Sequence, residues 1–329
     1  MSDGPLLSVR DLRVEFPTSG GLLAAVDGLT FELSAGETLG VVGESGAGKS
    51  ATASALLGLH PREAKVTGSI QFRGQELIGL GDKELRPFRG DRIAMIFQDA
   101  TSSLNPVLRI GDQIAEAIRA HYDLSRSELK ARVVGLLELV GISSPAERAD
   151  QYPHEFSGGM RQRAMIAMAI ANDPDVLVAD EPTTALDVTI QAQVLEVMER
   201  IKERTEAAIV MITHDLGVVA GLADRVLVMY AGREVELGGV EDVFYRSRHP
   251  YTRGLLASLP RLDRRGAGGR LHRIDGNPPS LLEIPSGCEF HPRCPYALVG
   301  LCDVSRPELT VVGDAHWSSC HRWQELEPR

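Results

Sequence analysis

The sequence predicts an α/β fold with a parallel sheet at its core, and three observations support this. Two apolar runs, 175–180 and 207–213, each follow a segment of helical pattern, and strands that alternate with helices form parallel sheets. Segment 6–42 alternates polar and apolar residues, which is typical of antiparallel strands, and segment 66–98 contains more strand. After residue 240, prolines, glycines and all four cysteines gather, which indicates a small appended domain.

The remaining elements follow in chain order. An apolar strand at 38–43 ends the strand-rich start, and residues 49–59 carry small and apolar side chains at helical spacing. From about 111 to 171 the pattern is helical, and residues 223–238 return to the alternation of a hairpin. These segments together predict a domain over 1–240, with a helical subdomain at about 99–172, and a second domain over 241–329.

One helix in this stretch has both of its ends marked in the sequence. Ser125 and Glu128 have the spacing of a capping box, and Gly141 follows the last apolar position. The apolar residues between them fall on one helical face: Leu129, Val133, Leu136 and Val140. We therefore expect a helix here that packs on that face.

Composition places the chain among ordinary globular proteins. Of its 329 residues, 43% are hydrophobic and 24% are charged. The net charge of −10 does not attract nucleic acid, so we expect no nucleic-acid partner. The first residues lack the apolar core of a secretory signal, and no run reaches the ~18 apolar residues of a spanning helix. We therefore expect a cytosolic chain that meets a membrane only through a partner.

A phosphate-binding loop stands between the strand at 38–43 and the helix at 49–59. Residues 43–50, "GESGAGKS", fit the pattern G-x-x-x-x-G-K-[ST]. The backbone N–H groups of such a loop surround phosphates, Lys49 reaches the β and γ oxygens, and the Ser50 hydroxyl can ligate Mg²⁺. The loop therefore predicts binding of a nucleoside triphosphate.

A pair of acids follows a second apolar strand. Asp180 ends the run 175–180, where it can hold the shell of a Mg²⁺ ion, and Glu181 follows at once. Alone, such a pair could simply cap a strand in solvent. With a phosphate loop upstream, Glu181 is suited to polarise an attacking water, and the pair predicts hydrolysis.

A second small-residue turn precedes a helical run. Ser157, Gly158 and Gly159 stand just ahead of residues that contain no helix breaker before Pro174. Backbone N–H groups at a helix N-terminus suit an anion. The chain therefore carries two predicted phosphate cradles.

In their order along the chain, these motifs resemble the nucleotide-binding subunit of an ATP-binding cassette (ABC) transporter. The phosphate loop, Gln98 after "RIAMIF", "SGG", "VADEP", "ALD" and His214 in "MITHD" follow that family's order across residues 40–215. The resemblance implies a P-loop NTPase fold of ABC type, with a mixed sheet core, an antiparallel β subdomain and an α-helical subdomain. It also implies an ATPase coupled to transport, with ATP and Mg²⁺ as cofactors.

The resemblance assigns a role to each matching position. Phe16 would stack on adenine, although its offset from the loop is longer than in the commonest family pattern. Glu181 would act on water, while His214 and Gln98 would contact or sense the γ-phosphate, and these three are the expected catalytic residues. Mg²⁺ would be held by Ser50, Gln98 and Asp180. The expected ATP contacts are Phe16, Gly43, Ser45, Gly46, Ala47, Gly48, Lys49, Ser50, Ala51, Gln98 and Asp180.

The same family accounts for the second cradle. In it, two cassettes pack head to tail, and each signature turn covers the ATP held by the partner's phosphate loop. By this resemblance Asp187 would link the two active sites, and the implied partner is a second ABC ATPase subunit, either a paralogue or an identical chain. The signature residues acting in trans would be Ser157, Gly158, Gly159 and Met160.

The end of the chain resembles the C-terminal extension of oligopeptide and dipeptide permease ATPases. The resemblance is carried by "RHPYTRGLLASLP" at 248–260 and by the Pro-rich segment before the cysteines. It implies an importer of peptides, although related systems import nickel chelates, glutathione or sugars. It also implies two transmembrane permease subunits, an external solute-binding protein and a peripheral place on the cytoplasmic side of the cell membrane. The segment 99–114 would face the permease.

All four cysteines lie in this extension. Clustered cysteines in a reducing compartment favour metal or cluster binding over disulfides. Four thiolates suit an iron–sulfur cluster or tetrahedral zinc, although zinc sites often have closer pairs; the cysteines could also be plain reduced thiols or disulfides. Members of the permease group carry a [4Fe–4S] cluster on a similar tail, so the resemblance favours that cluster on Cys288, Cys294, Cys302 and Cys320. His291, His316 and His321 are further possible ligands.

Two other classes of protein compete with the transport ATPase. A non-transport ABC ATPase that acts on DNA or ribosomes typically carries coiled-coil inserts or two cassettes, whereas this chain has one cassette, no heptad run and no basic stripe. A metal-binding regulator with vestigial ATPase motifs is disfavoured because every hydrolytic position is filled. The transport ATPase is the hypothesis that accounts for both halves of the chain.

Overall fold

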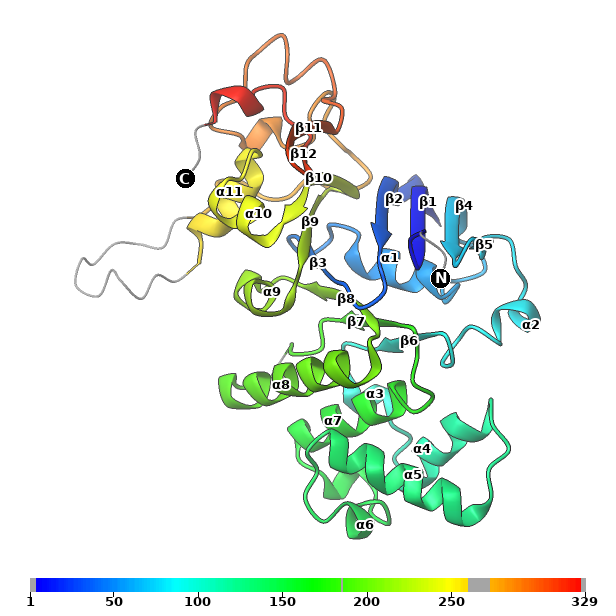
Figure 1. Cartoon of the computed structure of the whole chain (residues 1–329). Coiled ribbons are helices and arrows are strands. Elements are labelled where there is room, and N and C mark those ends of the chain that lie inside the picture. Colours follow the sequence, from blue (N-terminus) through cyan, green and yellow to red (C-terminus); the bar gives the residue numbers. More distant parts are fainter. Residues whose placement is uncertain (1–3, 185, 260–272, 327–329) are drawn as a thin grey trace, which may run out of the picture. The chain divides into compact units, whose positions relative to one another are not determined.

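The computed structural model describes residues 4–184, 186–259 and 273–326 (Figure 1). The chain divides into two compact units. The first comprises residues 4–6, Leu33–Thr38 and Gly79–Ile212; the second comprises Leu7–Glu32, Leu39–Ile78 and the described residues from Thr213 onward. The units interleave along the chain, and the domain boundary expected near residue 240 stays a prediction.

A parallel sheet forms the centre of the first unit. Strands β6 (Ile93–Ile96), β7 (Val176–Asp180) and β8 (Ala208–Thr213) lie in the order β8-β7-β6, and both neighbouring pairs are parallel. Helix α8 (Val188–Thr205) connects β7 to β8. Every residue of β7 and β8 is buried, as is usual for parallel strands. The expected alternation of parallel strands with a helix is therefore confirmed over these residues.

The first unit also contains the helices that precede β7. They are α2 (Asp82–Leu85), α3 (Ala100–Ser103), α4 (Ile110–Arg119), α5 (Arg126–Leu139), α6 (Pro145–Arg148), a 3₁₀ turn (Pro153–Glu155) and α7 (Gly158–Ala169). The Ser125 hydroxyl accepts the Glu128 N–H at 3.3 Å, and the Glu128 carboxylate accepts the Ser125 N–H at 2.9 Å. The capping box is therefore confirmed. So is the apolar face of α5, because Leu129, Val133, Leu136 and Val140 are buried.

An antiparallel sheet belongs to the second unit. Its strands lie in the order β2-β1-β4-β5, with bounds Gly21–Leu33, Leu7–Thr18, Lys65–Phe72 and Gln75–Glu76. Strands β1 and β4 pair antiparallel, with an irregularity between Arg10 and Arg13. Helix α1 (Lys49–Leu56) ends earlier than the expected stretch 49–59. The backbone turns left-handed at Gly58 (φ 62°), a common way for a helix to stop.

The cysteine-bearing extension adds strands to a second sheet of the same unit. Strands β9 (Arg225–Tyr230) and β10 (Arg233–Gly239) form the expected hairpin, and β3 (Thr38–Val42) pairs parallel with β9. Strand β12 (His316–Ser318) then pairs with β10, and β11 (Thr310–Gly313) pairs with β12, both antiparallel. The extension is thus built onto the sheet whose strand β3 leads into the phosphate loop.

An aromatic core joins the extension to this sheet. It lies among α9 (Leu216–Leu222), α10 (Val240–Tyr245) and α11 (Pro250–Ala257). The ring of Tyr230 lies 4.6 Å from that of Tyr251 and 5.3 Å from that of Phe290, measured between centroids. All three side chains are fully buried. Because aromatic rings bury large apolar areas, this trio is a major source of the unit's stability.

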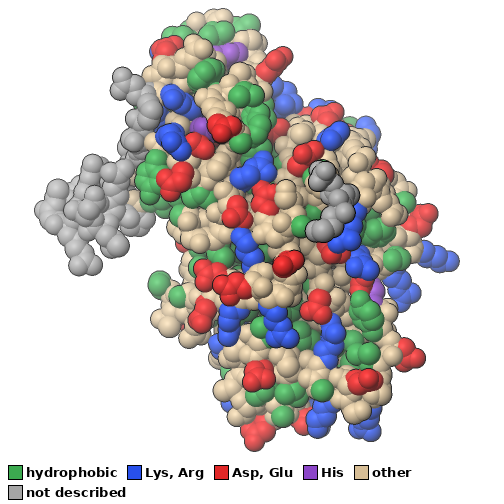
Figure 2. All heavy atoms as spheres, in the orientation of Figure 1, with side chains coloured by type: hydrophobic (Ala, Val, Ile, Leu, Met, Phe, Trp, Pro, Cys, Tyr) green, Lys and Arg blue, Asp and Glu red, His purple; other side chains and the backbone are tan. Residues whose placement is uncertain are grey.

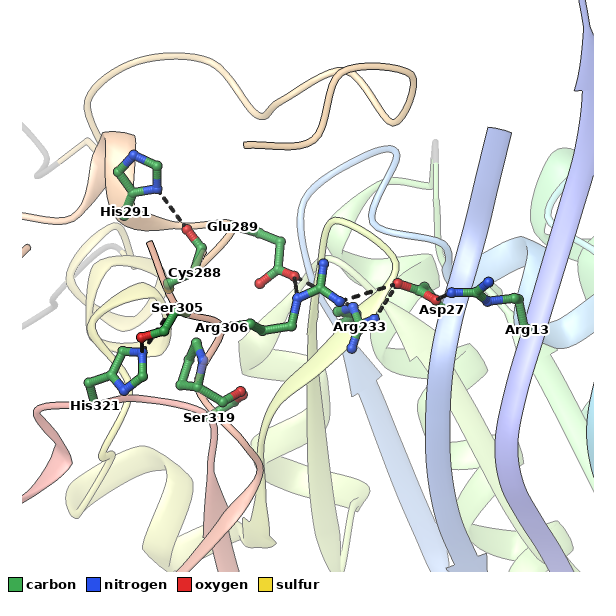
Figure 3. A network of polar contacts seen from close by, with 11 residues as sticks. Arg13, Asp27, Arg233, Cys288, Glu289, His291, Ser305, Arg306, Ser319 and His321 are labelled. Carbon is green, nitrogen blue, oxygen red and sulfur yellow. Dashed lines mark hydrogen bonds and ion pairs between the residues drawn. The ribbon is translucent and has the colours of Figure 1, made fainter. Parts of the chain in front are cut away.

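A network of ion pairs connects the antiparallel sheet to the extension within this unit (Figure 3). Asp27 on β2 bonds Arg13 on β1 and Arg233 on β10. Glu289 pairs with Arg233 at 3.5 Å and with Arg306 at 2.8 Å. Burial acts to raise the pKa of Asp27, but the bonds from Arg13 and Arg233 outweigh it, so the pKa lies below its ordinary value.

Two surface properties bear on possible partners. Among the described helices, none combines the length and the apolar character that crossing a bilayer requires. On the face drawn in Figure 2, Lys and Arg side chains are interspersed with Asp and Glu side chains.

Candidate functional site

The phosphate loop connects the buried strand β3 to helix α1. Two of its glycines have no room for a side chain: a Cβ on Gly43 would lie 2.3 Å from the carbonyl oxygen of Met229, and one on Gly48 would lie 2.2 Å from that of Ala25. Gly48 also has a φ of 100°, which residues other than glycine rarely adopt. The loop therefore needs glycine at both ends of the pattern, because its backbone packs directly against other backbone.

The Lys49 side chain lies inside this loop. Lys49 is 5% exposed, and its Nζ donates to the carbonyl oxygens of Gly43 (2.8 Å) and Glu44 (3.1 Å). Ser45 and Gly46, at the tip of the loop, are exposed. The ammonium is thus held beside the backbone that such loops present to phosphates.

Sequence reasoning missed the residues that hold the loop from outside. The Glu44 N–H donates to Tyr251 Oη at 2.8 Å, and the Glu44 carboxylate accepts two bonds from Arg293, at 2.6 and 3.0 Å. Tyr251 belongs to the "HPYT" stretch, which the sequence marked only through a resemblance. Glu44 and Arg293 are 249 positions apart, and no motif spacing connects them.

Gln98 and Glu181 come together in the first unit. Glu181 follows β7 with a φ of 49°, a conformation that costs free energy in a residue other than glycine. Its Oε2 accepts from Gln98 Nε2 at 3.3 Å and from the Thr184 hydroxyl at 2.7 Å. The adjoining Asp180 is buried. Two side-chain donors therefore orient the Glu181 carboxylate.

The second cradle lies at the start of helix α7. Ser157 is the N-cap, and its hydroxyl oxygen accepts the Met160 N–H at 3.3 Å. Gly158 is exposed, and a Cβ there would meet nothing within 4 Å. A Cβ on Gly159 would instead lie 2.7 Å from Cγ2 of Ile190 in α8. The turn therefore exposes Ser157 and Gly158, while Gly159 packs against α8.

The other expected site residues lie at the ends of elements. Asp187 caps α8 by accepting the N–H groups of Thr189 and Ile190, both at 3.0 Å. Phe16 is half-buried near the end of β1, and His214 is exposed just after β8. Of the remaining loop residues, Ala47 is buried, Ala51 is half-buried and Ser50 is exposed.

The expected nucleotide residues are divided between the two units. The second unit contains the phosphate loop, Phe16 and His214. The first unit holds the remaining residues of the expected set: Gln98, Asp180, Glu181, the signature turn and Asp187.

The four cysteines line one cavity in the extension. All four are free thiols; Cys302 is buried and the others are half-buried. The cavity is small, with a volume of about 20 Å³. The sulfur of Cys302 accepts the Leu298 N–H and that of Cys320 accepts the Arg322 N–H, both at 3.4 Å. Within the described ranges, no three or more His, Cys, Asp or Glu side chains are arranged to hold a metal ion.

Burial favours the protonated thiols of Cys288, Cys294 and Cys320. It raises the pKa of Cys288 to about 12 and that of Cys320 to about 11, and it also raises the pKa of Cys294. Charges on neighbouring cysteines add to each of these shifts. Because a ligating thiolate must lose its proton, ligation here would release protons.

The three histidines considered as further ligands make other contacts. His291 and His321 line the cavity. A ring nitrogen of His291 lies 2.9 Å from the Cys288 carbonyl oxygen (Figure 3). His321 lies 2.8 Å from the carbonyl oxygen of Ser305 (Figure 3). His316 instead forms a buried pair with Glu236, at 2.9 Å.

Comparison with known proteins identifies the class to which this fold belongs. The sequence matches the family model for ABC transporters over residues 26–184, a range that includes the phosphate loop, the signature turn and the acid pair. A solved dimeric structure of MJ0796, a bacterial ABC transporter cassette, resembles the chain with a TM-score of 0.64 and 25% identity, covering 71% of this chain and 98% of that one. The expected ABC cassette fold, with its antiparallel β subdomain, is confirmed.

The C-terminal region narrows the class further. A model for the C-terminal region of oligopeptide/dipeptide transporters matches residues 235–302. The chain is 53% identical to the dipeptide transport ATP-binding protein DppD of Bacillus subtilis (strain 168) over 317 residues, 96% of this chain and 94% of that protein. It is 52% identical to the oligopeptide transport ATP-binding protein OppD of Salmonella typhimurium (strain LT2) over 317 residues, 96% and 93% of the two chains. The chain belongs to the oligopeptide/dipeptide family of ABC transporter ATP-binding proteins.

Proposed function

We propose that this chain hydrolyses ATP to energise the uptake of peptides through membrane permease subunits. The observation that carries the proposal is that both parts of the chain match one transport family, whose named relatives transport dipeptides and oligopeptides. The partners would be two transmembrane permeases, an external solute-binding protein and a second cassette. The chain would lie at the cytoplasmic face of the membrane, bound through the permeases.

Within this function, the loop over 43–50 binds the phosphates of ATP, and Phe16 stacks on the adenine. Lys49, now bonded to loop carbonyl oxygens, would bond the β and γ oxygens instead. Mg²⁺ would be held by Ser50, Gln98 and Asp180, which offer the hydroxyl, amide and carboxylate oxygens that this hard cation prefers. The Gln98 amide nitrogen already donates to Glu181, so its amide oxygen is the atom presented to a cation.

Glu181 is the residue assigned to the attacking water. Its carboxylate is oriented by Gln98 and Thr184, and a positioned carboxylate is a suitable general base. His214 would contact the γ-phosphate and hold the geometry of hydrolysis. The exposure of His214 after β8 is compatible with that contact.

The signature turn is assigned to ATP held by a second cassette. Ser157 and Gly158 are exposed at the N-terminus of a 12-residue helix, where the helix dipole and the backbone N–H groups favour an anion. Met160 supplies the N–H that fixes the serine, and Asp187 is exposed on the neighbouring helix. When hydrolysis removes the γ-phosphate contacts, the two cassettes separate and transmit motion to the permease.

The permease contact is assigned to the segment 99–114. Val107 is 75% exposed and Leu108 is 37% exposed. Adjacent exposed apolar side chains are typical of interaction sites. Contact with a membrane-embedded partner would bury them.

A [4Fe–4S] cluster is assigned to the cysteine cavity. The four cysteines that line one cavity match such clusters in number and ligand type, although their side chains, as the described residues place them, are not arranged as a metal site. Two of the sulfurs accept hydrogen bonds from backbone N–H groups. Such bonds shift the reduction potential of an iron–sulfur cluster. When bound, the cluster would cross-link the loops that carry the cysteines and stabilise a small region. Iron and sulfide analysis of anaerobically purified protein tests this assignment, and stoichiometric zinc without iron would contradict it.

Peptide uptake in cells that lack this chain tests the proposed function. Uptake of a labelled dipeptide should be restored by the wild-type gene and not by Lys49→Ala, which removes the phosphate-binding ammonium. Unlabelled peptides should compete, whereas glutathione, sugars and nickel chelates should not. Competition by one of these other cargoes, with none by peptides, would assign the chain to a different import system.

A further inference from the structure

The phosphate loop contains an acid beside the place where a triphosphate binds. Glu44 follows Gly43 and precedes Ser45. A carboxylate so near a polyanion repels it, and the repulsion is strong where protein excludes water. A loop with this residue therefore needs a compensating positive charge.

Arg293 supplies that charge from the extension. Its two terminal nitrogens donate to the two carboxylate oxygens of Glu44, at 2.6 and 3.0 Å. This bidentate geometry is the strongest form of the pair. The Arg293 side chain is only 5% exposed and that of Glu44 is 26% exposed. The pair is thus largely shielded from water. In such a place, a charged side chain without its partner costs free energy.

Arg293 is itself held in place by its surroundings. Its Nε donates to the Asp275 carbonyl oxygen at 3.0 Å, and Nη1 lies 3.3 Å from Tyr230 Oη. The guanidinium also lies 5.8 Å from the ring centre of Tyr230 and 5.9 Å from that of Phe290, within the range of cation–π attraction. A preorganised guanidinium loses little entropy in fixing its partner.

Tyr251 holds the backbone of the same residue. Its hydroxyl oxygen accepts the Glu44 N–H at 2.8 Å, and its ring is fully buried against Tyr230 and Phe290. The Glu44 carbonyl oxygen in turn accepts from Lys49. The amide, the carboxylate and the carbonyl of one loop residue are therefore each bonded, two of them by the extension.

We propose that Arg293 and Tyr251 are positioning residues for ATP, through which the C-terminal extension holds the phosphate loop and cancels the charge of Glu44. This inference rests on the proposed binding of ATP phosphates by the loop. It gives the extension a direct part in nucleotide affinity, separate from whatever occupies the cysteine cavity.

Charge and packing can be separated by four variants of the full-length protein. Arg293→Gln should weaken ATP binding about tenfold, because the charge of Glu44, a residue of the loop, is then uncompensated. Glu44→Gln should bind ATP at least as tightly as wild type, since Arg293 keeps its charge near the phosphates. The double variant should regain most of the affinity lost in Arg293→Gln. Tyr251→Phe should weaken binding about threefold, the size of one lost neutral hydrogen bond.

The matched control is a variant of Arg306, another arginine of the extension that bonds a carboxylate. Arg306 bonds Glu289 at 2.8 Å, so Arg306→Gln should leave ATP affinity within twofold of wild type. Fluorescent-nucleotide titration gives the affinity, and thermal unfolding shows whether each variant is folded.

Two outcomes would overturn the inference. One is wild-type affinity in Arg293→Gln; the other is weaker binding in both single variants with no recovery in the double, the pattern of a merely structural pair. Lys49→Ala, measured in parallel, tests the proposed function itself. If Lys49→Ala binds ATP normally, the loop assignment fails, whereas if only Arg293→Gln binds normally, the positioning role alone fails.

Discussion

The two phosphate cradles of this chain differ in how they are supported. The phosphate loop is enclosed: Lys49 is buried within it, Gly43 has no room for a Cβ, and Glu44 is bonded by residues of the extension. The signature turn is open, because Ser157 and Gly158 are exposed, while Gly159 behind them packs against α8.

The difference bears on the proposal that both helix N-termini bind phosphate. Helix α1 begins at Gly48 without a side-chain cap, whereas α7 is capped by the Ser157 hydroxyl. The first cradle is completed by its own chain, which surrounds it. The second is a surface feature that a second molecule can complete. Four predictions test this contrast, from the largest expected effect to the smallest.

The largest expected effect is a loss of ATP turnover in a variant that leaves both cradles intact. Glu181→Gln should lower ATP turnover by about two to four orders of magnitude, the usual loss when a general base is removed. Both cradles are intact in this variant, so ATP binding and ATP-dependent association should persist. Phosphate release and gel filtration with ATP measure the two properties. Turnover equal to that of wild type would remove Glu181 from its assigned role.

Blocking the open cradle should lower turnover by a smaller factor. In Ser157→Arg, a long side chain occupies the exposed turn, so association with a second cassette and turnover should fall about 30-fold while ATP affinity is unchanged. Ser125→Arg is the matched control, because it also removes a serine N-cap, about 1 kcal/mol, but at α5. Full turnover in a homodimer of Ser157→Arg would show that the turn does not act across chains.

Adding one methyl group to a glycine of each cradle should change the free energy of unfolding by different amounts. Gly43→Ala places a Cβ 2.3 Å from the Met229 carbonyl oxygen, and such overpacking should cost about 2 kcal/mol of unfolding free energy. Gly158→Ala meets nothing within 4 Å and should change stability by less than about 0.5 kcal/mol. Urea midpoints of the two variants test this. Equal midpoints would mean that the loop is not the more tightly packed cradle.

The smallest effect is a pH dependence in the unit that holds the enclosed cradle. Burial, the largest cause, raises the pKa of Glu234 on β10 from 4.5 to about 7; Asp11 adds to this shift and Arg233 opposes it. Between these values the native state binds more protons than the unfolded state, so stability falls as pH rises. The loss from pH 5 to pH 8 should be about 2 kcal/mol.

Glu234→Gln isolates that contribution. The variant carries no titrating group at this position, so its stability should vary less between pH 5 and pH 8 and should exceed that of wild type at pH 8. Thermal unfolding at the two pH values measures the difference. An unchanged pH slope would assign the dependence to another group.

The residues proposed for the nucleotide site were assigned from sequence because their motifs are local. The spacing of Gly48, Lys49 and Ser50 encodes the loop, and the capping box of Ser125 and Glu128 begins α5 where it was expected. The end of α1 was less predictable, since apolar residues continue past Leu56, while the backbone turns left-handed at Gly58. The roles assigned to the site residues stay predictions.

The sequence by itself therefore determined the family, the phosphate loop, the signature turn and the alternation of strands and helices. Each of these depends on residues a few positions apart, where backbone geometry and hydrogen bonding leave few choices. Tertiary structure decided which distant loops meet: Arg293 reaches Glu44, four cysteines line one cavity, and His316 pairs with Glu236. Such contacts join residues far apart in the sequence, as does the pairing of β12 with β10, and contacts over such separations leave no periodic trace in the chain.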